Sequence, residues 1–269
     1  MSILNASNVE IRQVWANNLE DEIKLIRDVV DDYPYVAMDT EFPGTVTVIS
    51  NVDDKESSYK ALKENVDLLK LIQLGLTFSD DQGNLPTGGT QKYSVWQFNF
   101  REFNLTKDSY NSESIDFLIG RGIDFRRNNE EGVDAIKFSE LLMSSGVVLN
   151  PEVHWLVFHG SSDFGYLIKL LTGKSRLPDT EPEFLKVVET FFPVIYDVKC
   201  IIRFCYNLYG GLDKVAKTLN VERVGVGHQA GSDSLLTCCT FFKLIQVYNH
   251  LRDSPEKYAG CVFGLTTGR

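Results

Sequence analysis

The sequence lacks any run of eighteen apolar residues, which is about the length that a helix needs to cross a membrane. Its first residues also lack a charged stretch followed by an apolar one, so we expect no secretory leader, no membrane partner and a protein that stays inside the cell. It has no linker rich in glycine, serine or proline, and no internal repeat. These absences favour one globular domain over residues 1–269, and 43% hydrophobic residues suffice for its core.

Cysteine is scarce, and its spacing excludes the common zinc modules. There is no Cys-x-x-Cys pair and no histidine at zinc-finger spacing from a cysteine. All the cysteines lie in apolar or helical surroundings, so we predict reduced, buried thiols and a reducing compartment. The five are Cys200, Cys205, Cys238, Cys239 and Cys261.

Basic residues are also in short supply. Lysine and arginine number 27 against 37 aspartate and glutamate residues, which gives a net charge of -10. This balance argues against broad electrostatic binding of a polyanion, because such binding depends on Lys and Arg that neutralise phosphates. It does not exclude a nuclease, since bound metal ions supply positive charge locally.

What the sequence does contain is an alternation of strand-like and helical segments, which predicts an α/β domain with a mixed sheet flanked by helices. The first part reads as one or two helices over residues 9–30, followed by a meander of three strands. In the last of these strands, the stripe Trp96, Phe98 and Phe100 has strand spacing and is assigned to the core. The predicted strands are residues 35–41, 68–78, 93–100, 155–159 and 195–198. The predicted later helices are residues 112–120, 135–144, 163–171, 198–204, 212–219 and 233–251.

The most informative feature lies at the end of the first predicted strand. An apolar run over residues 35–38 leads directly into Asp39-Thr40-Glu41. Side chains two apart in a strand share a face, so the two carboxylates converge. Like charges at a partly buried strand end are costly unless a cation lies between them, and a hard divalent ion such as Mg²⁺ or Mn²⁺ suits oxygen ligands. The pattern indicates a metal site.

The same three residue types recur at Asp179-Thr180-Glu181 with a different meaning. Pro178 and Pro182 flank this copy, and no apolar run precedes it. We interpret it as a solvated loop. The tripeptide alone therefore does not identify a metal site, and further carboxylates are needed.

Two further acids sit where predicted helices begin. Asp163 follows a strand and opens a helix, and Asp233 opens the last long helix. Alone, each is typical of an acid in the first turn of a helix. Together with Asp39 and Glu41, they can meet at the carboxyl edge of one sheet and hold two divalent ions roughly 3.5 to 4 Å apart, as in phosphodiester cleavage. His228 lies five residues before Asp233, within reach of an attacking water as general base.

Asp39-x-Glu41, Asp163 and His228-x4-Asp233 together resemble the DEDDh group of 3′-to-5′ exonucleases, whose fold is like that of ribonuclease H. The sequence around these residues is similar to the Caf/Pop-type deadenylase, a catalytic subunit of the Ccr-Not complex, over nearly the whole chain. The stretches that carry this similarity are residues 38–44, 71–78, 96–100, 140–143, 163–166 and 228–237.

The resemblance implies a site and a reaction. Its metal ligands, for two Mg²⁺ or Mn²⁺ ions, are Asp39, Glu41, Asp163 and Asp233. It implies that His228 activates water, and that single-stranded poly(A) RNA is shortened from its 3′ end to release adenosine monophosphate. Its implied partners are a Not-type scaffold and a Ccr-type deadenylase, and its implied location is cytoplasm and nucleus. One departure is visible, because the family usually carries an aromatic residue before the third acid, where this chain has Ser161-Ser162.

Three questions stay open at this point. Phe42, beside the acids, either stacks on a base of the substrate or belongs to the core of the strand. A second hypothesis for the whole chain is a weakly active adaptor of the same fold that links another nuclease to the complex. A third is an exonuclease that trims DNA.

Overall fold

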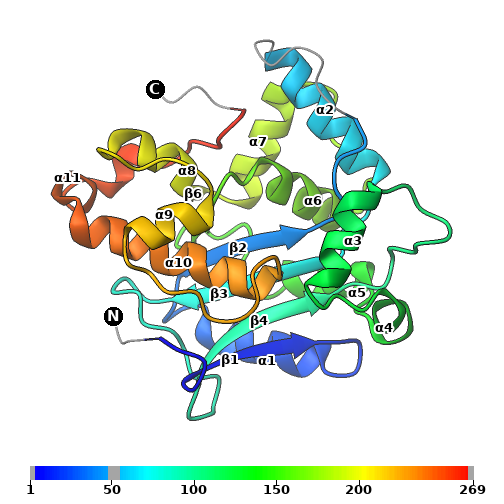
Figure 1. Cartoon of the computed structure of the whole chain (residues 1–269), viewed down its shortest axis with the longest axis horizontal. Helices are drawn as coiled ribbons and strands as arrows, with labels where there is room; N and C mark the ends of the chain where they lie inside the picture. The colour runs from blue at the N-terminus through cyan, green and yellow to red at the C-terminus, as the bar shows by residue number, and fades with distance from the viewer. Residues whose placement is uncertain (1–3, 48–54, 266–269) are drawn as a thin grey trace.

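The computed structural model describes residues 4–47 and 55–265 and, among side chains, those of residues 4–47 and 58–265. Over these residues the chain builds a six-stranded mixed sheet in the order β1-β4-β3-β2-β5-β6 (Figure 1). The strands are β1 (Val9–Val14), β2 (Tyr35–Glu41), β3 (Gln73–Ser79), β4 (Tyr93–Asn99), β5 (His154–Val157) and β6 (Val194–Asp197). Helices flank the sheet, so the predicted α/β class with a mixed sheet is confirmed.

The directions of the strands decide where their ends lie. β3 runs antiparallel to both β2 and β4, which confirms the predicted meander. β1 is parallel to β4, and β5 is parallel to both β2 and β6. Every strand except β3 therefore ends at the same edge of this sheet, so acids at the ends of β2 and β6 and just after β5 lie at that edge.

Two core clusters cover the two faces of the sheet. Met38 and Trp96 point into one cluster, and their neighbours Ala37 and Val95 point into the other, as strand alternation requires. The first is completed by α1 (Leu19–Val29), α5 (Ala135–Met143), α6 (Ser161–Thr172) and α7 (Glu181–Phe191). The second is completed by α8 (Val198–Ile201), α9 (Leu212–Thr218) and α10 (Ala230–Val247). In Figure 1, α10 crosses in front of the sheet and α1 lies behind it. The predicted core stripe of β4 is buried throughout.

Three more helices follow β2 and β4 along the chain. α2 (Lys55–Leu68) packs against α6 and adds Tyr59 and Val66 to the first cluster. α3 (Ser112–Gly120) was predicted, whereas α2 and α4 (Phe125–Glu131) were not. α3 and α4 close a small satellite core that includes Ile72 and Phe103.

The prediction of a helix from residue 9 is wrong, because residues 9–14 form β1. Two periodicities overlap in this segment, and the apolar residues that suggested a helix belong partly to a strand and partly to α1. Pairing with β4 decides the outcome, with Ile11 opposite Val95. Arg12 on β1 reaches α1, where its guanidinium donates to both carboxylate oxygens of Glu22 at 2.7 and 2.8 Å.

Residues 179–181 are only partly the solvated loop that we predicted. The side chain of Asp179 is 95% exposed, but Glu181 begins α7. Thr180 is the N-cap of this helix and forms a capping box with Glu183. Pro182 is favoured at a helix start, so the proline that suggested a loop marks a helix instead.

The last predicted helix is divided in two. α10 ends at Val247, and α11 (Asn249–Arg252) follows. Tyr248 between them has an extended backbone, with φ of -107° and ψ of 102°. Together they cover most of the predicted helix over residues 233–251.

The prediction of five reduced thiols is wrong for two of them, because Cys200 and Cys261 form a disulfide. The two residues are 61 positions apart, and only the packing of the last described segment beside β6 brings them together. There the amide of Gly260 donates to the carbonyl of Ile195 at 2.9 Å. The other cysteines are free and buried as predicted.

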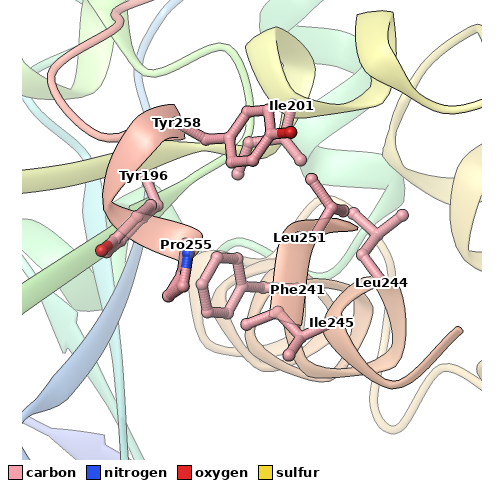
Figure 2. A pocket seen from close by; sticks show the side chains of 8 residues that line it. All are labelled: Tyr196, Ile201, Phe241, Leu244, Ile245, Leu251, Pro255 and Tyr258. Carbon is pink, nitrogen blue, oxygen red and sulfur yellow. The ribbon is translucent and has the colours of Figure 1, made fainter. Parts of the chain in front are cut away.

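None of the helices in the described part of the chain is long and apolar enough to cross a membrane. A crevice where α8, α10, α11 and η2 (Pro255–Tyr258) meet is lined by apolar and aromatic side chains (Figure 2). Its volume of about 10 Å³ is only enough for about one water molecule, so it is a packing defect rather than a ligand site.

Close packing fixes the start of α10 on the sheet. A Cβ atom at Gly75 of β3 would lie 1.9 Å from the carbonyl oxygen of Ala230, so only glycine lets the helix approach this closely. The buried side chain of Gln97 accepts the amide of Gly231 at 2.9 Å, and Gln73 accepts that of Ala230 at 3.4 Å. These amides have no acceptor within the helix, so the sheet supplies one. Gly75 faces Asp39 in the β2–β3 register, which sets the start of α10 beside that acid.

We expect Gly75→Ala to lower the free energy of unfolding by about 1–3 kcal/mol or more, because the methyl group forces backbone away from backbone. Urea denaturation measures the change. Gly120→Ala is the matched control, since a Cβ atom there meets no heavy atom within 4 Å. Equal stability of the two variants would show that α10 is not tightly seated on β3.

Candidate metal centre at the sheet edge

β2 delivers its last three side chains to two sides of the sheet edge. Asp39 and Glu41 share one face by strand alternation. Thr40 between them is buried and points the other way, where its hydroxyl donates to Oδ1 of Asp163 at 2.5 Å. The end of this strand therefore connects an acid on α6 with the pair of acids on β2.

Asp163 and Asp233 both lie in the first turn of a helix, and each is 7% exposed. The backbone amide of His228 donates to Oδ2 of Asp233 at 2.9 Å. Arg223 contributes a guanidinium that donates to Oδ1 of the same carboxylate. Both carboxylate oxygens of Asp233 therefore accept hydrogen bonds from the loop that precedes α10.

His228 lies on the surface of the loop before α10. Its φ of 61° is in the left-handed region. Its ring is exposed, and it makes an edge-to-face contact with Phe117 of α3, with 4.7 Å between the ring centroids. The imidazole, Glu41 and Asp233 offer ligand atoms that all lie within 4.8 Å of one another. These three side chains can hold a metal ion.

The pKa of each of the four acids is raised, and burial is the largest cause for every one of them. Burial, followed by repulsion from Asp163, Asp233 and Glu41, raises the pKa of Asp39 well above its usual value. Burial and then repulsion raise the pKa of Glu41 to about 8. Burial raises the pKa of Asp163 to about 7, although the Thr40 hydrogen bond opposes this rise. The pKa of Asp233 is raised by burial and held back by Arg223.

The residues fit a hard divalent cation. Their donors are carboxylate oxygens, which Mg²⁺ and Mn²⁺ prefer, and a neutral imidazole nitrogen is a common further ligand. Unpaired buried carboxylates hold protons because nothing else neutralises them, and a cation removes that need. All five residues predicted from the sequence lie at this edge, although only Glu41, His228 and Asp233 form the compact group.

Sequence reasoning missed three residues of this region. Arg223 joins Asp233 to Asp213, with Nη2 2.7 Å from Oδ1 of Asp213. Thr40 was named only within a tripeptide, and Phe117 lies in the predicted helix over residues 112–120 without having been named. Nothing in the spacing of Arg223 distinguishes it from a surface cation, and its role depends on a loop conformation.

An open cavity of about 490 Å³ adjoins Glu41. Phe42 lines it, and the ring of Phe42 also stacks on Tyr166 at 4.9 Å between centroids. Phe42 thus packs on the core and is half-exposed at the cavity, so its part in binding stays a prediction. The remaining lining residues are Gly44, Asn111, Glu113, Ser114, Phe117 and Leu118.

Comparisons with known proteins bear on this site. The chain matches the CAF1 family ribonuclease over residues 14–141 and 137–241. It is 56% identical to "Probable CCR4-associated factor 1 homolog 7" of Arabidopsis thaliana, over 97% of this chain and 95% of that protein. It is 45% identical to poly(A) ribonuclease pop2 of Schizosaccharomyces pombe, over 88% of this chain and 70% of that protein.

Solved structures agree. S. pombe Pop2p in its Mg²⁺- and Mn²⁺-bound form superposes with a TM-score of 0.86 at 43% identity, over 95% of this chain and 99% of that one. CAF1 co-crystallised with the yeast NOT1 MIF4G domain gives a TM-score of 0.81 at 33% identity, over 98% of this chain and 100% of that one. Escherichia coli exonuclease I gives 0.55 at 13% identity, over 81% of this chain and 42% of that one, and shares the fold alone. The predicted ribonuclease H-like fold is confirmed.

The raised pKa values predict how stability depends on pH when divalent metal is chelated. Between the unfolded-chain pKa of about 4.3 for a glutamate and the folded-state pKa of about 8 for Glu41, the folded protein binds more protons than the unfolded chain. The stabilisation that comes from protonated Glu41 is fully present at low pH, and it is lost as the pH rises to about 8. Glu41→Gln removes one such group, so we expect its stability to fall less steeply than that of the unsubstituted protein.

Urea denaturation in EDTA at pH 5, 6, 7 and 8 measures the two slopes. Asp179→Asn, which neutralises an exposed carboxylate, is the control and should keep the original slope. Parallel pH profiles for Glu41→Gln and the unsubstituted protein would show that this carboxylate is not buried among like charges.

Proposed function

The chain belongs to the CAF1 ribonuclease family, and we propose that it is a metal-dependent 3′-to-5′ exoribonuclease that shortens the poly(A) tail of messenger RNA and releases adenosine monophosphate. The observation that carries this proposal is the group of four acids, two buried and two partly exposed, and one exposed histidine at the carboxyl edge of the sheet. The name poly(A) ribonuclease, given to the S. pombe relative, supports the choice of substrate. We treat residues 1–269 as a single exonuclease domain.

In this proposal Asp39, Glu41, Asp163 and Asp233 hold two divalent ions, Mg²⁺ or Mn²⁺. The related Pop2p has been described in a Mg²⁺- and Mn²⁺-bound form, which supports the choice of metals. Bound ions supply activation of a water and stabilisation of the leaving oxygen. The chain's own contribution is to hold four oxygen ligands at one edge, in positions set by β2, α6 and α10.

In this proposal His228 is the general base and not a metal ligand, although its ring lies close enough to Glu41 and Asp233 to share an ion with them. Its imidazole is exposed to the solvent that supplies the attacking water, and it lies beside Glu41 and Asp233. The bond from its backbone amide to Asp233 keeps the loop in place while the ring stays free to accept a proton. Loop anchoring and proton transfer are thus divided between two parts of one residue.

The cavity beside Glu41 is the proposed place for the 3′-terminal nucleotide. Phe42 and Phe117 both line it, and aromatic rings stack on bases of single-stranded RNA. Ser161 and Ser162, which stand where the family usually has an aromatic residue, are partly exposed in the first turn of α6. We propose that stacking on Phe42 and Phe117 carries the larger share of base binding in this chain.

The proposed partners are a Not-type scaffold and a Ccr-type deadenylase, in cytoplasm and nucleus. Support for the scaffold comes from CAF1 co-crystallised with the yeast NOT1 MIF4G domain. The second deadenylase and the location rest on the family resemblance.

The purified protein should trim single-stranded oligo(A) RNA from the 3′ end in Mg²⁺ or Mn²⁺, and Asp39→Ala should abolish trimming because a metal ligand is lost. Gel analysis of end-labelled RNA and of matched DNA, with and without chelator, gives the result. Trimming that persists in the variant or in chelator would remove the metal mechanism. An inactive unsubstituted protein would favour the adaptor, and equal cleavage of DNA would favour the DNA exonuclease.

Replacing the proposed base should slow turnover without removing the metal. We expect His228→Ala to lower kcat by on the order of 10² to 10⁴, with Mn²⁺ affinity largely intact. His250→Ala, at an exposed histidine on α11, is the control. Unchanged turnover in His228→Ala would place the base elsewhere.

A further inference from the structure

Asp197 is a buried carboxylate outside the proposed ligand set. It ends β6, at the same sheet edge as the site, and is 0% exposed. Its two oxygens accept four backbone amides. Oδ1 accepts from His159 and Lys199, both at 2.9 Å, and Oδ2 accepts from Gly160 at 3.1 Å and Phe263 at 2.9 Å.

Burying the Asp197 carboxylate costs free energy, and its hydrogen bonds offset this cost. A fully buried carboxylate is strongly disfavoured unless it is paired or hydrogen-bonded, and the described residues give Asp197 no ion pair. Four amides directed at one carboxylate replace the water that it has lost. Through these amides Asp197 connects three segments, which are the turn before α6, the last described residues and the start of its own helix α8.

The first of these segments is the turn that leads to Asp163. His159 has a φ of 65°, in the left-handed region that residues other than glycine seldom adopt. Gly160 is the N-cap of α6, and a Cβ atom there would lie 2.5 Å from a methyl carbon of Val157. Asp197 accepts the amides of both residues, so it fixes the turn three residues before Asp163.

The second segment is the last described part of the chain, residues 259–265. Besides the amide of Phe263 that Asp197 accepts, the ring of Phe263 lies edge-to-face with His159 at 4.8 Å between centroids. Val262 and Leu265 are buried in the core beside α6. The Cys200–Cys261 disulfide ties the segment to α8, which is the third segment and begins directly after Asp197.

We propose that Asp197 is a positioning residue for Asp163, and that the disulfide-anchored segment 259–265 helps to hold the same turn. We call Asp197 and this segment together the brace. The proposal deepens the function proposed above and rests on it. Asp197 does not touch metal or RNA. It holds the turn that sets Asp163, and Thr40 then fixes the Asp163 carboxylate from the β2 side.

A redox consequence follows from the same brace. A dithiol reductant breaks the Sγ–Sγ bond, leaving two cysteine thiols while the reductant becomes a disulfide. Disulfides are uncommon in reducing compartments, where such dithiols are abundant. Reduction would leave the Asp197 hydrogen bonds in place but remove the covalent anchor, so its effect should be smaller than that of a change at Asp197.

The first test is Asp197→Asn in the 269-residue chain. The carboxamide offers a donor where two of the four amides need an acceptor. We expect about 10- to 100-fold weaker Mn²⁺ binding, measured by electron paramagnetic resonance, and a kcat lowered to a similar extent. The KM for oligo(A) should stay the same, and circular dichroism should show a folded protein. Asp179→Asn makes the same chemical change at an exposed carboxylate and should bind Mn²⁺ normally.

A double-mutant cycle separates positioning from general damage. If Asp197 acts through Asp163, then adding Asp197→Asn to Asp163→Asn should weaken Mn²⁺ binding no further. A full additional loss would overturn the proposal. So would normal Mn²⁺ binding by Asp197→Asn in a protein whose unsubstituted form trims oligo(A). An unsubstituted protein that neither binds Mn²⁺ nor trims oligo(A) would instead refute the proposed function itself.

The covalent anchor gives a second test that stands even where Asp197→Asn fails to fold. Dithiothreitol and Cys261→Ser should each weaken Mn²⁺ binding several-fold relative to the oxidised, unsubstituted protein, and dithiothreitol should have no further effect on Cys261→Ser. Cys205→Ser, at a buried free cysteine, is the control and should keep the response to reductant. Mn²⁺ binding that is unaffected by both treatments would remove the segment 259–265 from the brace.

Discussion

The crowding of four carboxylates at one poorly hydrated sheet edge is the constraint on which the rest of the structure depends. Loss of hydration on burial raises the pKa of Asp39 most, and repulsion from three neighbouring acids adds to this effect. Arg223 offsets part of this charge through Asp233. Protons or divalent cations must supply the rest, and only cations allow all the acids to stay ionised at neutral pH.

Much of the fold serves to bring these charges together and keep them there. Because β3 alone runs against the other strands, the acids at the ends of β2 and β6 and just after β5 all reach one edge. Buried glutamines on β3 and β4 accept the first amides of α10, and Gly75 lets this helix approach the sheet. Asp197 has the same role at α6 that these glutamines have at α10. Each accepts backbone amides at the start of a helix whose first turn carries an acid of the site.

The sequence was sufficient for those parts of the site that depend on local periodicity. Strand alternation predicted that Asp39 and Glu41 share a face, and the starts of two helices were visible around Asp163 and Asp233. Arg223 and Asp197 act through contacts made only in the folded chain, so no local pattern reveals them. The disulfide was missed for the same reason, because Cys261 reaches Cys200 only after the last segment packs beside β6. At residues 9–14, pairing with β4 outweighed an apparent helical spacing.

The account's central claim is that cations replace protons at the carboxylate group. Titration calorimetry of Mn²⁺ binding at pH 7, in two buffers of different ionisation enthalpy, counts the protons released directly. The account predicts that binding releases protons, because the pKa of Glu41 is about 8 and that of Asp163 is about 7 in the metal-free protein. Binding with no proton release would contradict it, since the carboxylates would then already be ionised without a cation.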